Sequence, residues 1–232
     1  MRHRLLACRL AVASSALAVL ALAGCAAGVP NVAIDEGARA QIHSVRINPV
    51  VAMPKDMDFY GHAQGIAALA AGPFAGLMND KLSAEPKARL AGEIAGNHID
   101  VQAMLAAAFA RRASSDAAMK VVSGDAPADA QVDLVVNRYG FAIAHPGTAT
   151  LYPVFSVSAV MKSARGDVLW QGTDLMSALF ADNKAGHTLD DLTKDPEAVR
   201  QAFATGSDLV SGMLVKNLMG LEISQSVPGI QK

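Results

Sequence analysis

The first 24 residues constrain the rest of this chain most, because they form an export signal that the folded domain does not include. Three arginines stand within residues 1–9, residues 10–22 contain no charged residue, and two small residues then precede Cys25. This order of basic, apolar and small segments is typical of a secretory signal peptide. The uncharged run is shorter than the roughly 20 residues that cross a bilayer comfortably, so a permanent transmembrane helix is the weaker interpretation.

The end of this signal carries the most specific motif in the chain. The four residues Leu22-Ala23-Gly24-Cys25 resemble the lipobox of bacterial lipoproteins. The resemblance implies that the Cys25 sulfur receives a diacylglycerol, that cleavage occurs before it, and that the new amino group is acylated. An ordinary cleaved signal ending in Cys is the alternative. Since two lipid signals already anchor a protein stably, three chains on Cys25 would make its attachment to the membrane effectively permanent.

The residues after the cysteine bear on which membrane holds it. In many Gram-negative lipoproteins, an Asp directly after the lipidated Cys retains the protein in the inner membrane. Here Ala26 and Ala27 follow. The resemblance therefore favours the outer membrane, with the domain facing the periplasm.

Composition limits what the exported part can do. Arg2, Arg4 and Arg9 leave with the signal and no acidic residue does, so the 20 basic and 21 acidic residues of the chain become 17 and 21, a net charge of −4. Such a balance argues against nucleic-acid binding. Cys8 leaves as well, and lipid occupies the sulfur of Cys25, so the domain has no thiol for disulfides, nucleophilic catalysis or zinc-cysteine sites.

Hydrophobic periodicity after residue 40 alternates between strand and helix spacing. Asp100 is a good N-cap, and Asp195-Pro196-Glu197 is a typical helix start. Pro49 suggests that the first strand lies at a sheet edge, and Gly140 suggests a bulge or bend. Trp170 has the pattern of a hairpin core residue. We expect strands over 41–51, 119–122, 132–144, 154–162 and 168–173, with a turn at 163–167, and helices over 99–112 and 195–220.

Residues 61–78 are rich in Gly and Ala and carry no charge. They contain two pairs of glycines at the GxxxG spacing that lets membrane helices approach closely. A buried glycine-rich helix or loop is the preferred interpretation, because Pro73 would interrupt a helix. A segment that touches the bilayer or a partner helix is the alternative.

These elements predict one α+β domain, a mostly antiparallel sheet with helices packed on one face. The boundaries we expect are a signal peptide over 1–24, a lipidated tether over 25–40, the domain over 41–220 and a flexible tail over 221–232. The order of strand, capped helix, short strand and a hairpin containing Leu169-Trp170-Gln171-Gly172 resembles periplasmic lipoproteins with a TolB amino-terminal or CsgG-type domain. That resemblance implies a non-enzymatic role in envelope assembly, secretion or transport.

No catalytic, cofactor or metal motif stands out. The five histidines of the exported part form no HxH, HExxH or similar pair, and they are His43, His62, His98, His145 and His187. His187 with Asp190 and Asp191 is a weak candidate cation site, with a solvated loop preferred. Gly206-Ser207-Asp208 falls inside a predicted helix, not on a nucleophile elbow.

The sequence therefore predicts a non-enzymatic, membrane-anchored lipoprotein without cofactors. Its expected partners are other envelope proteins, or further copies of itself through strand edges or residues 61–78. A lipid- or glycan-binding carrier or hydrolase is the alternative, since scattered Ser, His and Asp residues can converge in space. A closed pocket with converging polar groups would favour that alternative.

Overall fold

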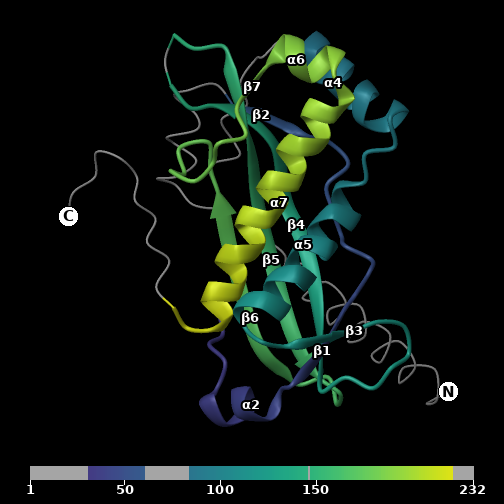
Figure 1. Ribbon diagram of the computed structural model, residues 1–232, viewed down its shortest axis with the longest axis vertical. Coiled ribbons are helices and arrows are strands. Elements are labelled where there is room, and N and C mark those ends of the chain that lie inside the picture. The colour runs from purple at the N-terminus through teal and green to yellow at the C-terminus, as the bar shows by residue number, and fades with distance from the viewer. Residues whose placement is uncertain (1–30, 61–83, 146, 222–232) are drawn as a thin grey trace, which may run out of the picture.

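The computed structural model describes residues 31–60, 84–145 and 147–221. Figure 1 shows one sheet of long strands with α5 and α7 lying across the same face. The elements in chain order are α2 (Glu36–Gln41), β1 (Ser44–Ile47), β2 (Asp58–Tyr60), α4 (Ala84–Gly96), α5 (Val101–Asp116), β3 (Lys120–Val122), β4 (Ala130–Ile143), β5 (Thr150–Ser163), β6 (Val168–Met176), β7 (His187–Thr188), α6 (Leu189–Lys194) and α7 (Pro196–Leu218).

The sheet has the strand order β3-β1-β4-β5-β6, with β2 beside β4 and β7 beside β5. The long strands β4, β5 and β6 pair antiparallel, whereas the short strands β1, β2 and β3 pair parallel with their neighbours. This confirms the predicted α+β class, with a mostly antiparallel sheet and helices packed on it. The predicted hairpin is also confirmed, because β5 and β6 pair directly across residues 163–167.

The predicted edge position of the first strand is wrong. β1 covers only 44–47 and lies between β3 and β4. Pro49 does not prevent this, because it follows the last backbone hydrogen bond of the ladder, which Asn48 N donates to Val132 O over 2.9 Å. A proline outside the ladder removes no donor from it.

The irregularity of β4 lies three residues before the predicted position. The register of β4 against β5 shifts between Val136 and Arg138, not at Gly140. Gly140 has a different role: its φ is 152°, and a Cβ there would lie 1.8 Å from the Asp58 carbonyl oxygen of β2. The glycine is needed because a second strand approaches its backbone.

The core lies between the sheet and α5 and α7. Phe203 on α7 packs its ring against Phe141 and Phe155 of the sheet at centroid distances of 5.1 and 5.8 Å. Trp170 is fully buried, as predicted. Fully burying such side chains stabilises the fold by about 1.5–3 kcal/mol each, which suits a domain without disulfides.

Both predicted helix starts are confirmed. The Asp100 carboxylate accepts from Ala103 N over 2.9 Å at the start of α5, and Asp195 accepts from Glu197 N over 2.9 Å at the start of α7. α5 runs four residues further than its predicted end at Arg112, to Asp116. The elements α2, α4, α6, β2 and β7 were not predicted from the sequence.

Part of the segment expected as the tether belongs to the described fold. Val32 forms an isolated antiparallel bridge with Gln171 of β6, and α2 follows with Asp35 as its N-cap. The predicted signal peptide, Cys25, residues 61–78 and the predicted tail after residue 221 lie outside the described residues. Within the described part of the chain, no helix is both long and apolar enough to cross a bilayer.

Candidate functional site

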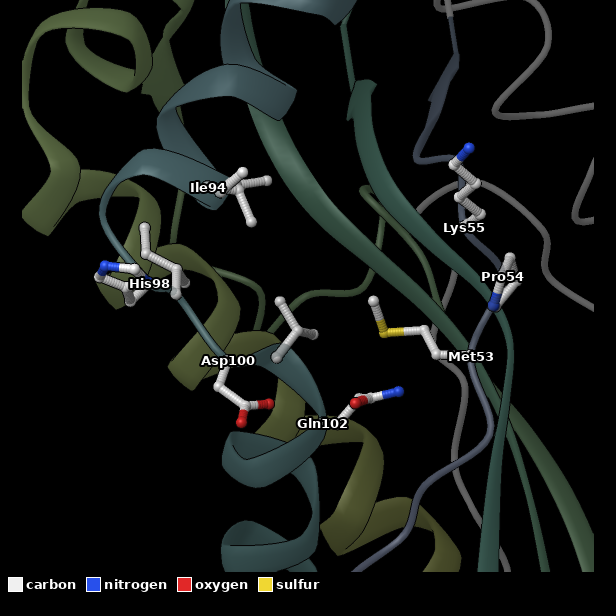
Figure 2. A pocket seen from close by; sticks show the side chains of 10 residues that line it. Met53, Pro54, Lys55, Ile94, His98, Asp100 and Gln102 are labelled. Carbon is white, nitrogen blue, oxygen red and sulfur yellow. The ribbon is translucent and has the colours of Figure 1, made fainter.

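A groove of about 550 Å³ is the candidate binding site of this domain. It opens between the loop after β1 and the junction of α4 and α5, as Figure 2 shows. Its lining combines apolar side chains with a few polar ones, and the residues are Met53, Pro54, Lys55, Ile94, Ala95, His98, Ile99, Asp100, Val101 and Gln102. Two of the lining residues, Ile99 and Val101, are buried in the core.

The polar groups of the groove already have structural partners or lie apart. The Asp100 carboxylate caps α5, and the Gln102 side-chain amide donates to Val51 O over 2.8 Å. His98 and Lys55 lie on opposite sides of the groove (Figure 2). His98 also has a φ of 52°, which lets the chain turn from α4 into α5. The groove can accept an apolar group, but it brings together no nucleophile and base.

The candidate cation site at residues 187–191 is a helix cap. The Asp191 carboxylate accepts from Thr188 N and Thr188 Oγ1 over 3.0 and 2.7 Å, forming a capping box for α6. The hydrogen bond from the Thr188 hydroxyl lowers the pKa of Asp191 most, and the bond from Thr188 N lowers it further. Asp190 pairs with Lys194 at 2.8 Å. Both carboxylates therefore have structural roles in α6. Thr188 followed three residues later by Asp191 is a capping-box signal, and it could have indicated this helix start from the sequence.

The remaining histidines are not gathered into one site. His43 and His145 are exposed at separate loops, His98 lies at the groove, and His187 begins β7. His62 lies outside the described residues. Across residues 31–60, 84–145 and 147–221, no group of three or more His, Cys, Asp or Glu side chains is placed to hold a metal ion.

Ser207 does not have the surroundings of a nucleophile. It lies inside α7 as predicted, and its side chain is fully buried without a hydrogen-bond partner. The neighbouring Asp208 forms an ion pair with Arg112 of α5 at 2.5 Å. These residues connect α5 and α7, and Gly206 lies against the Phe155 ring.

A buried carboxyl on β6 was not among the residues predicted from the sequence. Asp174 is 7% exposed, and Asn217 Nδ2 donates to its Oδ2 over 3.4 Å. Burial raises the pKa of Asp174 to about 6, and the hydrogen bond from Asn217 offsets only part of that effect. The predicted strand ended at residue 173. Continuing its alternation through Trp170 and Gly172 would have placed Asp174 on the buried face.

A second polar contact lies where β2 meets β4. The Tyr60 hydroxyl donates to Asp58 Oδ2 over 2.9 Å. Burial and then the Asp58 charge raise the pKa of Tyr60 to about 12, so the phenol stays protonated and acts as a donor. This hydrogen bond joins two residues of β2, and a protonated tyrosine beside a carboxylate is not an activated nucleophile.

Comparisons with known proteins find distant structural likeness and nothing closer. No family model matches the chain, and no curated protein matches it by sequence. Protein XCC0632 from Xanthomonas campestris, of the family DUF330, is similar at 13% identity over 83% of this chain and 94% of that one, with a TM-score of 0.41. PelC from Paraburkholderia phytofirmans, solved as a dodecamer, is similar at 11% identity over 82% and 95%, with a TM-score of 0.35.

The lipoprotein GNA1162 from Neisseria meningitidis is a third such structure. It shares 17% identity over 59% of this chain and 84% of that one, with a TM-score of 0.23. These likenesses are too distant to assign a function, because one fold carries many activities.

Proposed function

We propose that this chain is a lipoprotein of the bacterial cell envelope, anchored through acyl chains on Cys25 and facing the periplasm, with the outer membrane favoured. Its role is a non-catalytic, accessory one in envelope assembly, secretion or transport, exercised through protein partners. One observation carries the proposal: Leu22-Ala23-Gly24-Cys25 stands where the uncharged run of the signal ends. The TolB- and CsgG-type resemblance of the domain stays an expectation.

The chemistry of the described residues supports a non-catalytic role. In the groove, Asp100 caps a helix, Gln102 binds the backbone, and His98 and Lys55 lie on opposite sides; Ser207 is buried inside a helix and its hydroxyl has no hydrogen-bond partner. Catalysis by nucleophile and base requires both groups within hydrogen-bond reach of each other. The described domain is therefore better suited to binding than to covalent chemistry.

The anchor is tested by Cys25→Ser, with Cys8→Ser as the matched control. Cells fed radioactive palmitate should label the wild type and the Cys8→Ser variant, and their protein should fractionate with membranes. The Cys25→Ser variant should lose the label. Labelling that survives in Cys25→Ser, or a mature amino terminus without acyl mass, would contradict the anchor.

The accessory role is tested by recovering the native lipoprotein from detergent-solubilised membranes. We expect envelope proteins, or further copies of this chain, at a fixed stoichiometry. Recovery of the chain alone as a monomer, together with a bound small molecule, would contradict the accessory role.

A lipid or glycan carrier is the second candidate, because the groove at Met53, Ile94 and Ile99 can accept an apolar group, although its polar groups do not converge. Native mass spectrometry of the purified protein would then show a bound lipid or glycan. Ile94 is half-buried in that groove, so Ile94→Gln should lower the bound fraction without unfolding the domain. An unchanged bound fraction would place the ligand elsewhere.

A further inference from the structure

The chain leaves the lipidation site and joins the domain at the outer edge of β6. Val32 N donates to Gln171 O over 2.8 Å, and Gln171 N donates back to Val32 O over 3.0 Å. The Asn31 side-chain oxygen accepts from Thr173 N over 3.2 Å. These three hydrogen bonds fix the first described residues on β6, the last strand of the sheet.

The connection from Cys25 to this edge is short. Asn31 is the sixth residue after Cys25. A fully extended chain spans at most about 3.3–3.6 Å per residue, so the acylated sulfur lies within roughly 25 Å of the β6 edge. For comparison, the 23 residues of α7 make a helix about 35 Å long. The connection is therefore shorter than the domain that it holds.

The same region of the domain exposes apolar side chains. Five large hydrophobic residues of the described chain are exposed, and Val32 at 39%, Val168 at 48% and Leu221 at 53% are three of them. Val168 begins β6, and Leu221 follows α7. We call these three residues and the outer edge of β6 the β6 corner.

Two hydrogen bonds join the elements around the β6 corner, which are β6, α7 and α2. Trp170 Nε1, two residues after Val168, donates to Asn217 Oδ1 in the last turns of α7 over 3.4 Å. Arg39 of α2 donates to Leu218 O over 3.0 Å. Figure 1 shows α2, the start of β6 and the end of α7 at one end of the molecule, with α4 and α6 at the other.

The charges of this region are of both signs. Arg165 and Asp167 pair at 3.3 Å in the turn before β6, and Lys216 near the end of α7 is exposed. A covalent anchor and exposed apolar side chains can hold such a region at a membrane without anionic lipids.

We infer that the β6 corner faces the surface of the bilayer that holds the acyl chains, and that α4 lies on the side away from it. The inference rests on the proposed lipidation of Cys25. It assigns an interaction surface of the folded domain, and the partner is the lipid bilayer itself.

The test measures energy transfer from two positions of the full lipidated chain to lipids in the membrane. Arg165→Cys places a thiol beside the β6 corner, and Arg89→Cys places one on α4; both native side chains belong to exposed residues. The sulfur of Cys25 carries lipid, so a maleimide donor labels only the new thiol. The vesicles contain phosphatidylethanolamine with an acceptor on its headgroup.

We expect the donor at 165 to transfer at least about three times more energy than the donor at 89, since the two sites are separated by roughly the length of α7. Equal transfer, or more transfer from 89, would overturn the inference if mass spectrometry shows an acylated Cys25. A chain that lacks acyl mass and does not float with vesicles would instead overturn the proposed anchor.

A longer connection provides the control. A Gly/Ser linker of about 30 residues inserted between Ala27 and Gly28 has an average end-to-end distance of roughly 30 Å. We expect it to lower transfer from position 165 at least twofold. Unchanged transfer would mean that the short connection does not position the domain, which also counts against the inference.

Discussion

Asn217, near the end of α7, donates its side-chain amide to the buried carboxyl of Asp174 on β6 over 3.4 Å. The carbonyl oxygen of the same amide accepts from the Trp170 indole. One asparagine thus joins the helix to two positions of the hairpin strand, and burial is the main reason that the pKa of Asp174 is raised.

This environment predicts a pH-dependent stability. The pKa of Asp174 is about 6 in the folded state and 3.8 ordinarily, so the folded state binds its proton more tightly. The favourable contribution is complete below about pH 4, declines as the pH rises to about 6, and is absent above that. Asp174→Asn should raise the free energy of unfolding at pH 7.5 by about 2 kcal/mol, because it keeps the hydrogen bond without the buried charge.

Urea unfolding of both proteins from pH 4 to 8 checks this prediction. The difference between the two curves should grow with pH and level off above 6. Asp182→Asn, which removes an exposed carboxylate from the loop after β6, is the control and should show no such difference. A pH-independent difference for Asp174→Asn would contradict the prediction.

Two helical glycines should respond oppositely to alanine. A Cβ on Gly206 of α7 would lie 2.7 Å from the Phe155 ring and 3.1 Å from Met176, whereas a Cβ on Gly92 of α4 would meet nothing within 4 Å. Gly206→Ala should destabilise by about 1–3 kcal/mol through overpacking. Gly92→Ala should stabilise the fold by about 0.5–1 kcal/mol, because alanine has less conformational entropy to lose on folding than glycine. Thermal unfolding compares them, and equal shifts of the melting temperature would refute the packing explanation.

Among the described glycines, Gly140 has the least space for a side chain, because β2 approaches β4 there. Gly140→Ala would place its Cβ 1.8 Å from Asp58 O, so β2 must separate from β4. We expect a loss above about 3 kcal/mol, beyond the strain of φ alone.

Gly166→Ala distinguishes the effect of a positive φ from the effect of the contact with Asp58 at Gly140. Gly166 also has a positive φ, 90°, but open space around it. Gly166→Ala should lower the free energy of unfolding by only about 1 kcal/mol. If both variants lose the same stability in denaturant titrations, the contact with Asp58 is not what requires glycine at 140.

The N-cap of α5 offers a prediction at the groove. Asp100→Ala leaves Ala103 N–H without its acceptor and should destabilise by about 1 kcal/mol, while Asp100→Asn should cost only a few tenths. Circular dichroism during thermal unfolding measures both. A larger loss in Asp100→Asn than in Asp100→Ala would indicate that the carboxylate charge serves something other than the cap.

Sequence alone determined the features that depend on neighbouring residues. The caps at Asp100 and Asp195, the β5–β6 hairpin and the burial of Trp170 follow from local hydrogen bonding and from hydrophobic periods of two or 3.6 residues. The resemblance of Leu22-Ala23-Gly24-Cys25 to a lipobox is likewise a local signal, and the proposed function depends on it.

Tertiary structure decided what depends on residues far apart in the chain. The position of β1 inside the sheet, the need for glycine at 140 and the raised pKa of Asp174 arise from partners that no local pattern specifies. The bridge from Val32 to Gln171 is of the same kind, joining residues far apart in sequence through two backbone hydrogen bonds. Such contacts form only when the whole chain packs, because the chain entropy lost in bringing them together is offset by the shared core.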